Sequence, residues 1–153
     1  MDKIDKSWRT AITRRSASLP VRWLHSKRLI GNTVLDFGCG KGKDIEYLNS
    51  MGHLTTGYDP HHRTLEDNTY ALLYHYDTVV CNYVLNVLPK DKQRDILFRI
   101  KSCLREGCCA YITVRRDITK EGYTSRGTFQ RNVTLGLPVV HKTSGYCIYK
   151  LER

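Results

Sequence analysis

The sequence has no apolar run that approaches the roughly 20 residues an α-helix needs to cross a bilayer. Its first residues are charged and contain no apolar segment typical of a secretory signal peptide. None of the six cysteines forms a Cys-x-x-Cys pair, and His61 and His62 are adjacent, a spacing that rarely lets two side chains share one metal ion. These absences predict a cytoplasmic protein with free thiols, no structural metal and no membrane partner.

Acidic residues are also scarce. The chain carries 15 Asp and Glu against 25 Lys and Arg, so its formal net charge is +10. Eight of the basic residues fall within about the first thirty positions. Such an excess favours an anionic partner, which could be nucleic acid, a phosphorylated metabolite or an acidic protein. A solvated helix face explains the N-terminal run equally well.

Short apolar runs alternate with amphipathic segments along the 153 residues, a length that suits one domain. The runs predict strands at 33–37, 54–58, 77–84 and 110–114, helices at 41–51 and 89–106, and a closing hairpin within 139–151. This order predicts an α/β fold: a single, compact or truncated Rossmann-like domain over residues 32–153, with a mostly parallel sheet and a C-terminal antiparallel hairpin. Residues 60–75 show no clear periodicity.

Residues 1–31 are predicted to form a separate basic, helical N-terminal segment. Apolar residues repeat with helical spacing over 2–15, and a second short helix is predicted from Val21 to Gly31. The stretch 16–20, which ends in Pro20, is predicted to break the two helices apart.

A glycine cluster follows the first predicted strand. Gly38, Gly40 and Gly42 come directly after Asp36, and Asp59 stands at the end of the next strand. Glycine lets the backbone turn sharply and approach a ligand closely, and a carboxylate such as Asp59 can accept two hydrogen bonds from ribose hydroxyls. Because parallel strands end at the same edge of a sheet, we expect these residues to line one crevice.

Four interpretations of this loop are possible, and the sequence bears on each of them. A dinucleotide fingerprint requires glycine where Lys43 stands. A phosphate-binding P-loop requires four residues between its glycines and then Lys-Ser/Thr, whereas Gly38 and Gly42 enclose three and Asp44 follows Lys43. A tight strand-to-helix turn without any ligand is the third. The pattern Asp-x-Gly-x-Gly-x-Gly followed by an acid one strand later resembles class I methyltransferases.

Four strings extend the likeness to about 20–131, with gaps. They are Phe37–Gly42, Gly57–Pro60, Asn82–Val87 and Gly127–Gln130, and together they resemble the methyltransferases associated with DNA phosphorothioation gene clusters. By this resemblance the cofactor is S-adenosyl-L-methionine (SAM), and Asn82 and Tyr83 lie beside the methyl group as catalytic residues. The residues that would contact the cofactor are Asp36, Gly38, Cys39, Gly40, Gly42, Asp59, Pro60 and Asn82.

The chain departs from the class I pattern in two places. A strand that such enzymes usually have between Asp59 and Asp77 is missing, so no adenine contacts are assigned. The segment after Gln130 runs quickly into the final hairpin, which predicts a shortened helix and an open substrate side.

The acceptor is predicted less directly. Enzymes that methylate base amines commonly carry Asp/Asn-Pro-Pro-Tyr/Phe where this chain has Asn82-Tyr83-Val84-Leu85. Arg115 and Arg116 follow the strand at 110–114 and are the predicted substrate-binding residues, because guanidinium groups suit phosphate or carboxylate. The first hypothesis is a SAM-dependent methyltransferase with nucleic acid as the favoured acceptor or another anionic substrate. The alternative is a non-catalytic SAM-binding domain with a regulatory or partner-binding role.

Overall fold

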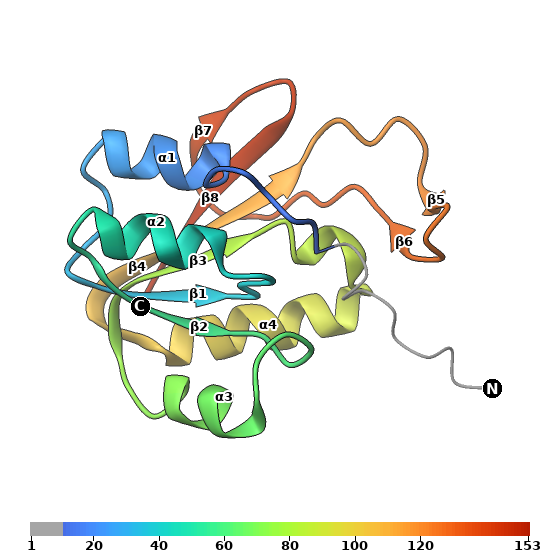
Figure 1. Cartoon of the computed structure of the whole chain (residues 1–153). Coiled ribbons are helices and arrows are strands. Elements are labelled where there is room, and N and C mark those ends of the chain that lie inside the picture. Colours follow the sequence, from blue (N-terminus) through green and yellow to red (C-terminus); the bar gives the residue numbers. More distant parts are fainter. Residues whose placement is uncertain (1–10) are drawn as a thin grey trace.

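The computed structural model describes residues 11–153 and contains a six-stranded sheet in the order β2-β1-β3-β4-β8-β7 (Figure 1). The first four strands of that order are mutually parallel, and β8 and β7 run antiparallel at the other end. A separate two-stranded hairpin is formed by β5 and β6. The strands are β1 (Thr33–Phe37), β2 (Leu54–Tyr58), β3 (Tyr76–Asn82), β4 (Leu104–Arg115), β5 (Gly122–Tyr123), β6 (Phe129–Gln130), β7 (Val139–Lys142) and β8 (Tyr146–Glu152).

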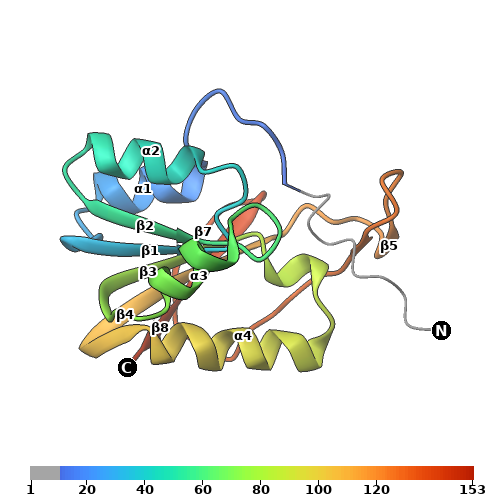
Figure 2. The ribbon, with the colours of Figure 1, turned by 60° about the horizontal axis from the view of Figure 1, so that its bottom comes forward.

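Helices cover both faces of the sheet (Figure 2). Helices α1 (Leu19–Ser26) and α2 (Lys43–Ser50) lie on one face, and α3 (Leu65–Ala71) and α4 (Lys90–Ser102) lie on the other. Successive residues of a strand point to opposite faces, so Val34 packs in the core under α1 and α2 while Leu35 packs in the core on the α4 side. The predicted Rossmann-like α/β fold, with its C-terminal antiparallel hairpin, is confirmed.

The N-terminal prediction needs correction. Residues 1–10 lie outside the described part of the chain, and residues 11–15, the described end of the helix predicted over 2–15, contain no helix. Helix α1 begins at Leu19 and ends at Ser26 instead of Gly31. Pro20 stands in its first turn, where proline costs no hydrogen bond, so it opens the helix instead of breaking it.

Two further boundaries differ from the prediction. Residues 65–71 form α3, which the aperiodic sequence did not indicate; within 11–153 no strand lies between β2 and β3, so β2 is the edge of the sheet. Helix α4 ends at Ser102 and β4 begins at Leu104, although the apolar spacing of Cys103 and Leu104 continues the helical pattern. Leu104 pairs with Tyr76 of β3, and this strand contact overrides the local periodicity.

A shortened helix was predicted after Gln130, but the segment between β6 and β7 contains no helix. Val133, Leu135 and Leu137 pack against the α4-side core at alternate positions. The structure has no helix long and apolar enough to cross a membrane anywhere in residues 11–153.

Candidate functional site

A cavity of about 380 Å³ opens at the carboxyl ends of β1, β2 and β3. Its walls come from the loop after β1 (36–44), the loop after β2 (58–62), the end of β3 (82–84) and the first turns of α4. These segments meet because parallel strands deliver their carboxyl ends to one edge. Nine residues predicted from the sequence to form the site line this cavity: Asp36, Gly38, Cys39, Gly40, Gly42, Asp59, Pro60, Asn82 and Tyr83.

The glycine loop has the backbone shape that its sequence predicted. Gly38, Gly40 and Gly42 have φ values of +86°, +53° and +85°, a region that residues with a Cβ rarely adopt. A Cβ on Gly38 would lie 2.4 Å from Val84 Cγ2, so a side chain there would clash with the turn after β3. Gly38 N donates to the Tyr58 carbonyl at 2.7 Å, which fixes the loop to the end of β2. The loop therefore packs closely against the ends of β2 and β3, where a side chain at Gly38 would not fit.

Asp59 holds the same loop from the other side. Its Oδ2 accepts a hydrogen bond from Gly40 N at 2.8 Å, and its Oδ1 accepts from His61 N at 2.9 Å and His62 N at 3.1 Å. The residue is buried, and His62 Nδ1 lies 3.3 Å from the same Oδ1. In this structure the carboxylate thus binds backbone N–H groups, a set of contacts that sequence spacing did not indicate.

Asn68 is a positioning residue that the sequence analysis missed. Its buried amide accepts from Asp59 N at 2.9 Å and donates to the Asp59 carbonyl at 2.9 Å. Asn68 lies in α3, whose N-cap Thr64 accepts from Asp67 N. That capping pattern is a signal in the sequence that could have indicated α3. The helix places Asn68 where it hydrogen-bonds the backbone of Asp59.

Asp36 is buried beneath the loop. Burial raises the pKa of its carboxyl well above the ordinary value, and the neighbouring Asp44 and Asp59 raise that pKa further. Asp44 is held by Ser18, whose N and Oγ donate to its two carboxylate oxygens at 2.7 and 2.8 Å. Nearby arginine side chains lower the pKa of Asp36 in part, so the cavity wall holds carboxylates and cations together.

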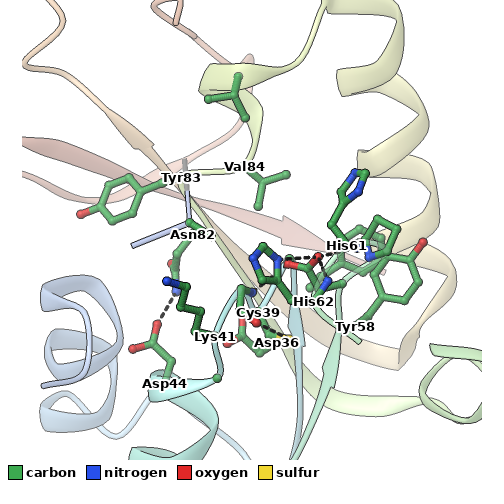
Figure 3. Close-up of a pocket in the computed structure, with 18 of the residues that line it drawn as sticks. Asp36, Cys39, Lys41, Asp44, Tyr58, His61, His62, Asn82, Tyr83 and Val84 are labelled. Carbon is green, nitrogen blue, oxygen red and sulfur yellow. Dashed lines mark hydrogen bonds and ion pairs between the residues drawn. The ribbon is translucent and has the colours of Figure 1, made fainter. Parts of the chain in front are cut away.

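Asn82 and Tyr83 close the end of β3 (Figure 3). Asn82 Nδ2 donates to Asp44 Oδ2 at 3.4 Å, while its Oδ1 is buried and has no hydrogen-bond partner within residues 11–153. Tyr83 has φ +63°, unusual for a residue other than glycine, and its ring points away from His61 and His62. Burial raises the pKa of its hydroxyl to about 12. The site thus holds an unsatisfied acceptor beside a strained strand end.

Part of the N-terminal segment also lines the cavity, which the sequence did not predict. Ala11, Ile12 and Arg14 contribute to its wall, and the Arg14 guanidinium lies 5.6 Å from the centre of the Tyr83 ring. Lys41 Nζ donates to Thr13 Oγ1 at 2.8 Å and ties this segment to the glycine loop.

Arg115 and Arg116 do not line the cavity. Arg115 Nε donates to Asp117 Oδ1 at 2.8 Å, and the same guanidinium donates to Gln130. Arg116 donates to the Thr143 carbonyl in the β7–β8 turn. Their predicted role in substrate binding stays a prediction. The residues described include no group of three or more His, Cys, Asp or Glu side chains that could hold a metal ion.

The sequence and the fold both resemble those of known methyltransferases. A family model described as a methyltransferase domain matches residues 5–134. No curated protein matches the chain.

Solved structures share the fold at low sequence identity. The 1,6-didemethyltoxoflavin-N1-methyltransferase of Burkholderia thailandensis, with bound 1,6-didemethyltoxoflavin and S-adenosylhomocysteine, is 18% identical (96% of this chain, 78% of that chain, TM-score 0.61). The magnesium protoporphyrin IX methyltransferase of Synechocystis PCC 6803, with bound S-adenosylhomocysteine, is 16% identical (94% and 91%, TM-score 0.61). A structure concerned with conversion of a disulfide bond into a thioacetal group during echinomycin biosynthesis is 24% identical (TM-score 0.56); it matches 67% of this chain, which spans 50% of its length.

Proposed function

Because the chain belongs to the methyltransferase domain family and is a SAM-dependent methyltransferase, we propose that its acceptor is anionic and, in first place, nucleic acid. The observation that carries this proposal is that five cationic side chains line the cavity, together with four aspartates. Arg14, Lys41, Lys43, Lys92 and Arg99 all line it. Arg14 is half-buried and its guanidinium lies over the ring of Tyr83, at the end of β3 where the acceptor would approach the cofactor.

The residues of the cavity suit the cofactor. The loop at Gly38–Gly42 offers backbone without Cβ atoms, and the buried carboxylate of Asp36 suits a ligand that carries ammonium and sulfonium charges. Asn82 Oδ1, which is buried and has no partner in the described part of the chain, would accept a hydrogen bond from the cofactor's amine or orient the acceptor. Asp59 would hold the ribose, and Pro60 would border it.

SAM supplies an activated methyl group whose carbon–sulfur bonding electrons return to sulfur when the acceptor takes the methyl. The chain's own task is to align the acceptor and exclude water. Asn82 and Tyr83, at the end of β3, would set the acceptor's approach. Arg14 and Lys41 would hold its negative charge beside the cavity.

The choice of nucleic acid has further support. The net charge of +10 and the absence of acidic residues between Asp5 and Asp36 suit a polyanion. The strings Asn82–Val87 and Gly127–Gln130 resemble methyltransferases associated with DNA phosphorothioation gene clusters, and we propose that the chain is of this kind. A small-molecule acceptor is the second candidate, since structural neighbours are named for 1,6-didemethyltoxoflavin and for magnesium protoporphyrin IX.

Asp36→Asn is expected to change stability and cofactor affinity in opposite directions. The ligand-free variant should be more stable than the wild type by about 1–3 kcal/mol at neutral pH, because a neutral amide costs less to bury than a carboxylate. Its affinity for SAM should fall by about 10–100-fold through loss of a charge-assisted contact. Urea denaturation and calorimetry measure the two effects, and the exposed Asp91→Asn in α4 is the control.

The stability difference should also depend on pH. Since the folded-state pKa of Asp36 lies above its unfolded value, the wild-type carboxyl stabilises the fold at acidic pH, and this stabilisation is lost as pH rises through the folded-state pKa. The two proteins should therefore be most alike near about pH 4 and diverge above it. A variant less stable than the wild type at neutral pH would contradict a net cost of burying the Asp36 carboxyl.

The acceptor is tested with radiolabelled SAM. The protein is incubated separately with RNA, single-stranded DNA, duplex DNA and a small-metabolite extract, and label is followed into each pool. Label in a nucleic-acid pool supports the proposal, and label only in the metabolite pool overturns nucleic acid in favour of the second candidate. No label in any pool, with SAM bound, would indicate the non-catalytic alternative.

Salt dependence gives an independent check. If the cationic side chains contact phosphates, log affinity for an oligonucleotide should fall against log salt concentration with a slope of about −0.7 to −0.9 per contact. Fluorescence anisotropy between low and physiological salt measures this slope. A flat response would show that the cations are solvated and do not contact a polyanion.

A further inference from the structure

Residues 116–131, here called the arm, form a hairpin outside the main sheet. In both ribbon views it projects from the edge of the domain that carries the glycine loop (Figures 1 and 2). Strands β5 and β6 pair antiparallel, and Gly127, with φ +77°, allows the turn between them. Thr124 and Thr128 close that turn: Thr124 N donates to the Thr128 carbonyl at 2.7 Å, and their hydroxyls lie 2.8 Å apart.

The base of the arm is fixed beside the cavity by one buried side chain. Asn86 Nδ2 donates to the Arg131 carbonyl at 3.0 Å, Asn86 Oδ1 accepts from Arg115 N at 2.8 Å, and Arg131 N donates to the Asn86 carbonyl at 2.9 Å. Asn86 is 1% exposed and lies within the 3₁₀ turn Leu85–Val87, of which Val87 lines the cavity. Asn86 thus bridges three segments that are distant in the chain.

The surface of the arm is cationic and aromatic. From 115 to 131 the sequence has five basic and two acidic residues. The acids are engaged locally: Asp117 pairs with Arg115, and Glu121 accepts from Asn132 N at 2.8 Å. Lys120 and Arg126 are exposed. Tyr123 is 60% exposed and meets Phe129 edge to face, with ring centres 5.3 Å apart.

An exposed tyrosine between two exposed cations matches the chemistry of single-stranded nucleic acid. Every base offers a face for stacking on an aromatic ring, and phosphates repeat along the strand at a spacing that separate cations can follow. A base in a duplex is already stacked on its neighbours, so this surface favours a single strand. A small acceptor held inside the cavity would not reach Tyr123, which does not line it.

We propose that the arm binds a single-stranded segment of the acceptor, with Tyr123 stacking on a base and Lys120 and Arg126 contacting phosphates, and so leads the strand into the cavity. This inference rests on the proposed nucleic-acid acceptor. It assigns a role to the Gly127–Gln130 string: Gly127 and Thr128 shape the turn, Phe129 supports Tyr123, and Gln130 accepts from Arg115 at the base.

The test uses the full chain and a fluorescein-labelled twenty-nucleotide poly(U) strand and its DNA counterpart. Tyr123→Ala should weaken binding by about tenfold, within the range measured for loss of one stacked base. Arg126→Ala should weaken it and reduce the salt slope by about 0.7. Matched controls are Tyr74→Ala in the exposed loop after α3 and Lys101→Ala near the end of α4, which should bind as the wild type does. All variants should keep wild-type affinity for S-adenosylhomocysteine.

Amide hydrogen exchange of the wild-type protein tests the same contact without any substitution. Adding the oligonucleotide should slow amide exchange within 119–131 more than in α3. Wild-type binding that is unchanged in Tyr123→Ala and Arg126→Ala, with no protection of the arm, would overturn the arm's role while leaving the nucleic-acid acceptor standing. Failure of the wild type to bind either strand also overturns the arm's role; the acceptor itself is then decided by labelled methyl transfer alone.

Discussion

Gly38→Ala is expected to weaken binding of S-adenosylhomocysteine by about 100-fold, which corresponds to about 2.7 kcal/mol. Two costs add up. A residue with a Cβ pays about 1–2 kcal/mol to adopt φ +86°, and the new methyl would lie 2.4 Å from Val84 Cγ2. Both Gly38 and Val84 line the cavity, so any relaxation of this clash moves its wall. Titration calorimetry on the purified variant measures the effect.

The chain offers a control that separates these two costs. Gly52 has φ +90° and nothing within 4 Å of a Cβ, so Gly52→Ala carries the backbone strain without a clash and lies outside the cavity. It should lose stability but retain affinity. The double variant Gly38→Ala/Val84→Ala should recover part of the lost affinity, because it removes the clashing methyl. Wild-type affinity in Gly38→Ala would show that the cofactor does not use this loop.

Asn82→Ala is expected to lower the rate of methyl transfer by about 100-fold while cofactor affinity changes by less than about tenfold. Misalignment of the reactants by about an ångström costs a factor of this size, and alignment matters most in the transition state. Asn82 Oδ1 is buried at the end of β3 and finds no partner among the described residues, so a donor on a ligand would satisfy it. Single-turnover transfer from labelled SAM to the pool that accepts label gives the rate, and calorimetry gives the affinity.

Two variants accompany this experiment. Asn32→Ala removes an exposed asparagine outside the cavity and should leave the rate unchanged. Tyr83→Phe keeps the ring and removes the hydroxyl, so a normal rate in that variant would assign Tyr83 a packing role. Full activity in Asn82→Ala would remove this residue from the reaction, and equal losses of rate and affinity would make it a binding residue only.

The cofactor loop was predictable because its signals are local. A strand followed at once by Gly38, Gly40 and Gly42 prescribes a sharp turn, and the rule that parallel strands end at one edge brings Asp59 and Asn82 to the same place. The sequence of α3 offers only the Thr64 cap and no apolar period. Its helix has 7 residues, too few to show a clear apolar period, and it is held by packing on β2.

What the sequence determined by itself is the alternation of strands and helices, the glycine loop and the acids at strand ends, since each follows from backbone preferences within a few residues. Only the tertiary structure decided which partners these groups find. Ser18 reaches Asp44 across 26 positions, Asn86 joins the arm to β4, and Arg115 turns to Gln130 instead of the cavity. Such contacts depend on which segments the packed sheet brings together, and the spacing of residues along the chain does not indicate which distant segments become neighbours.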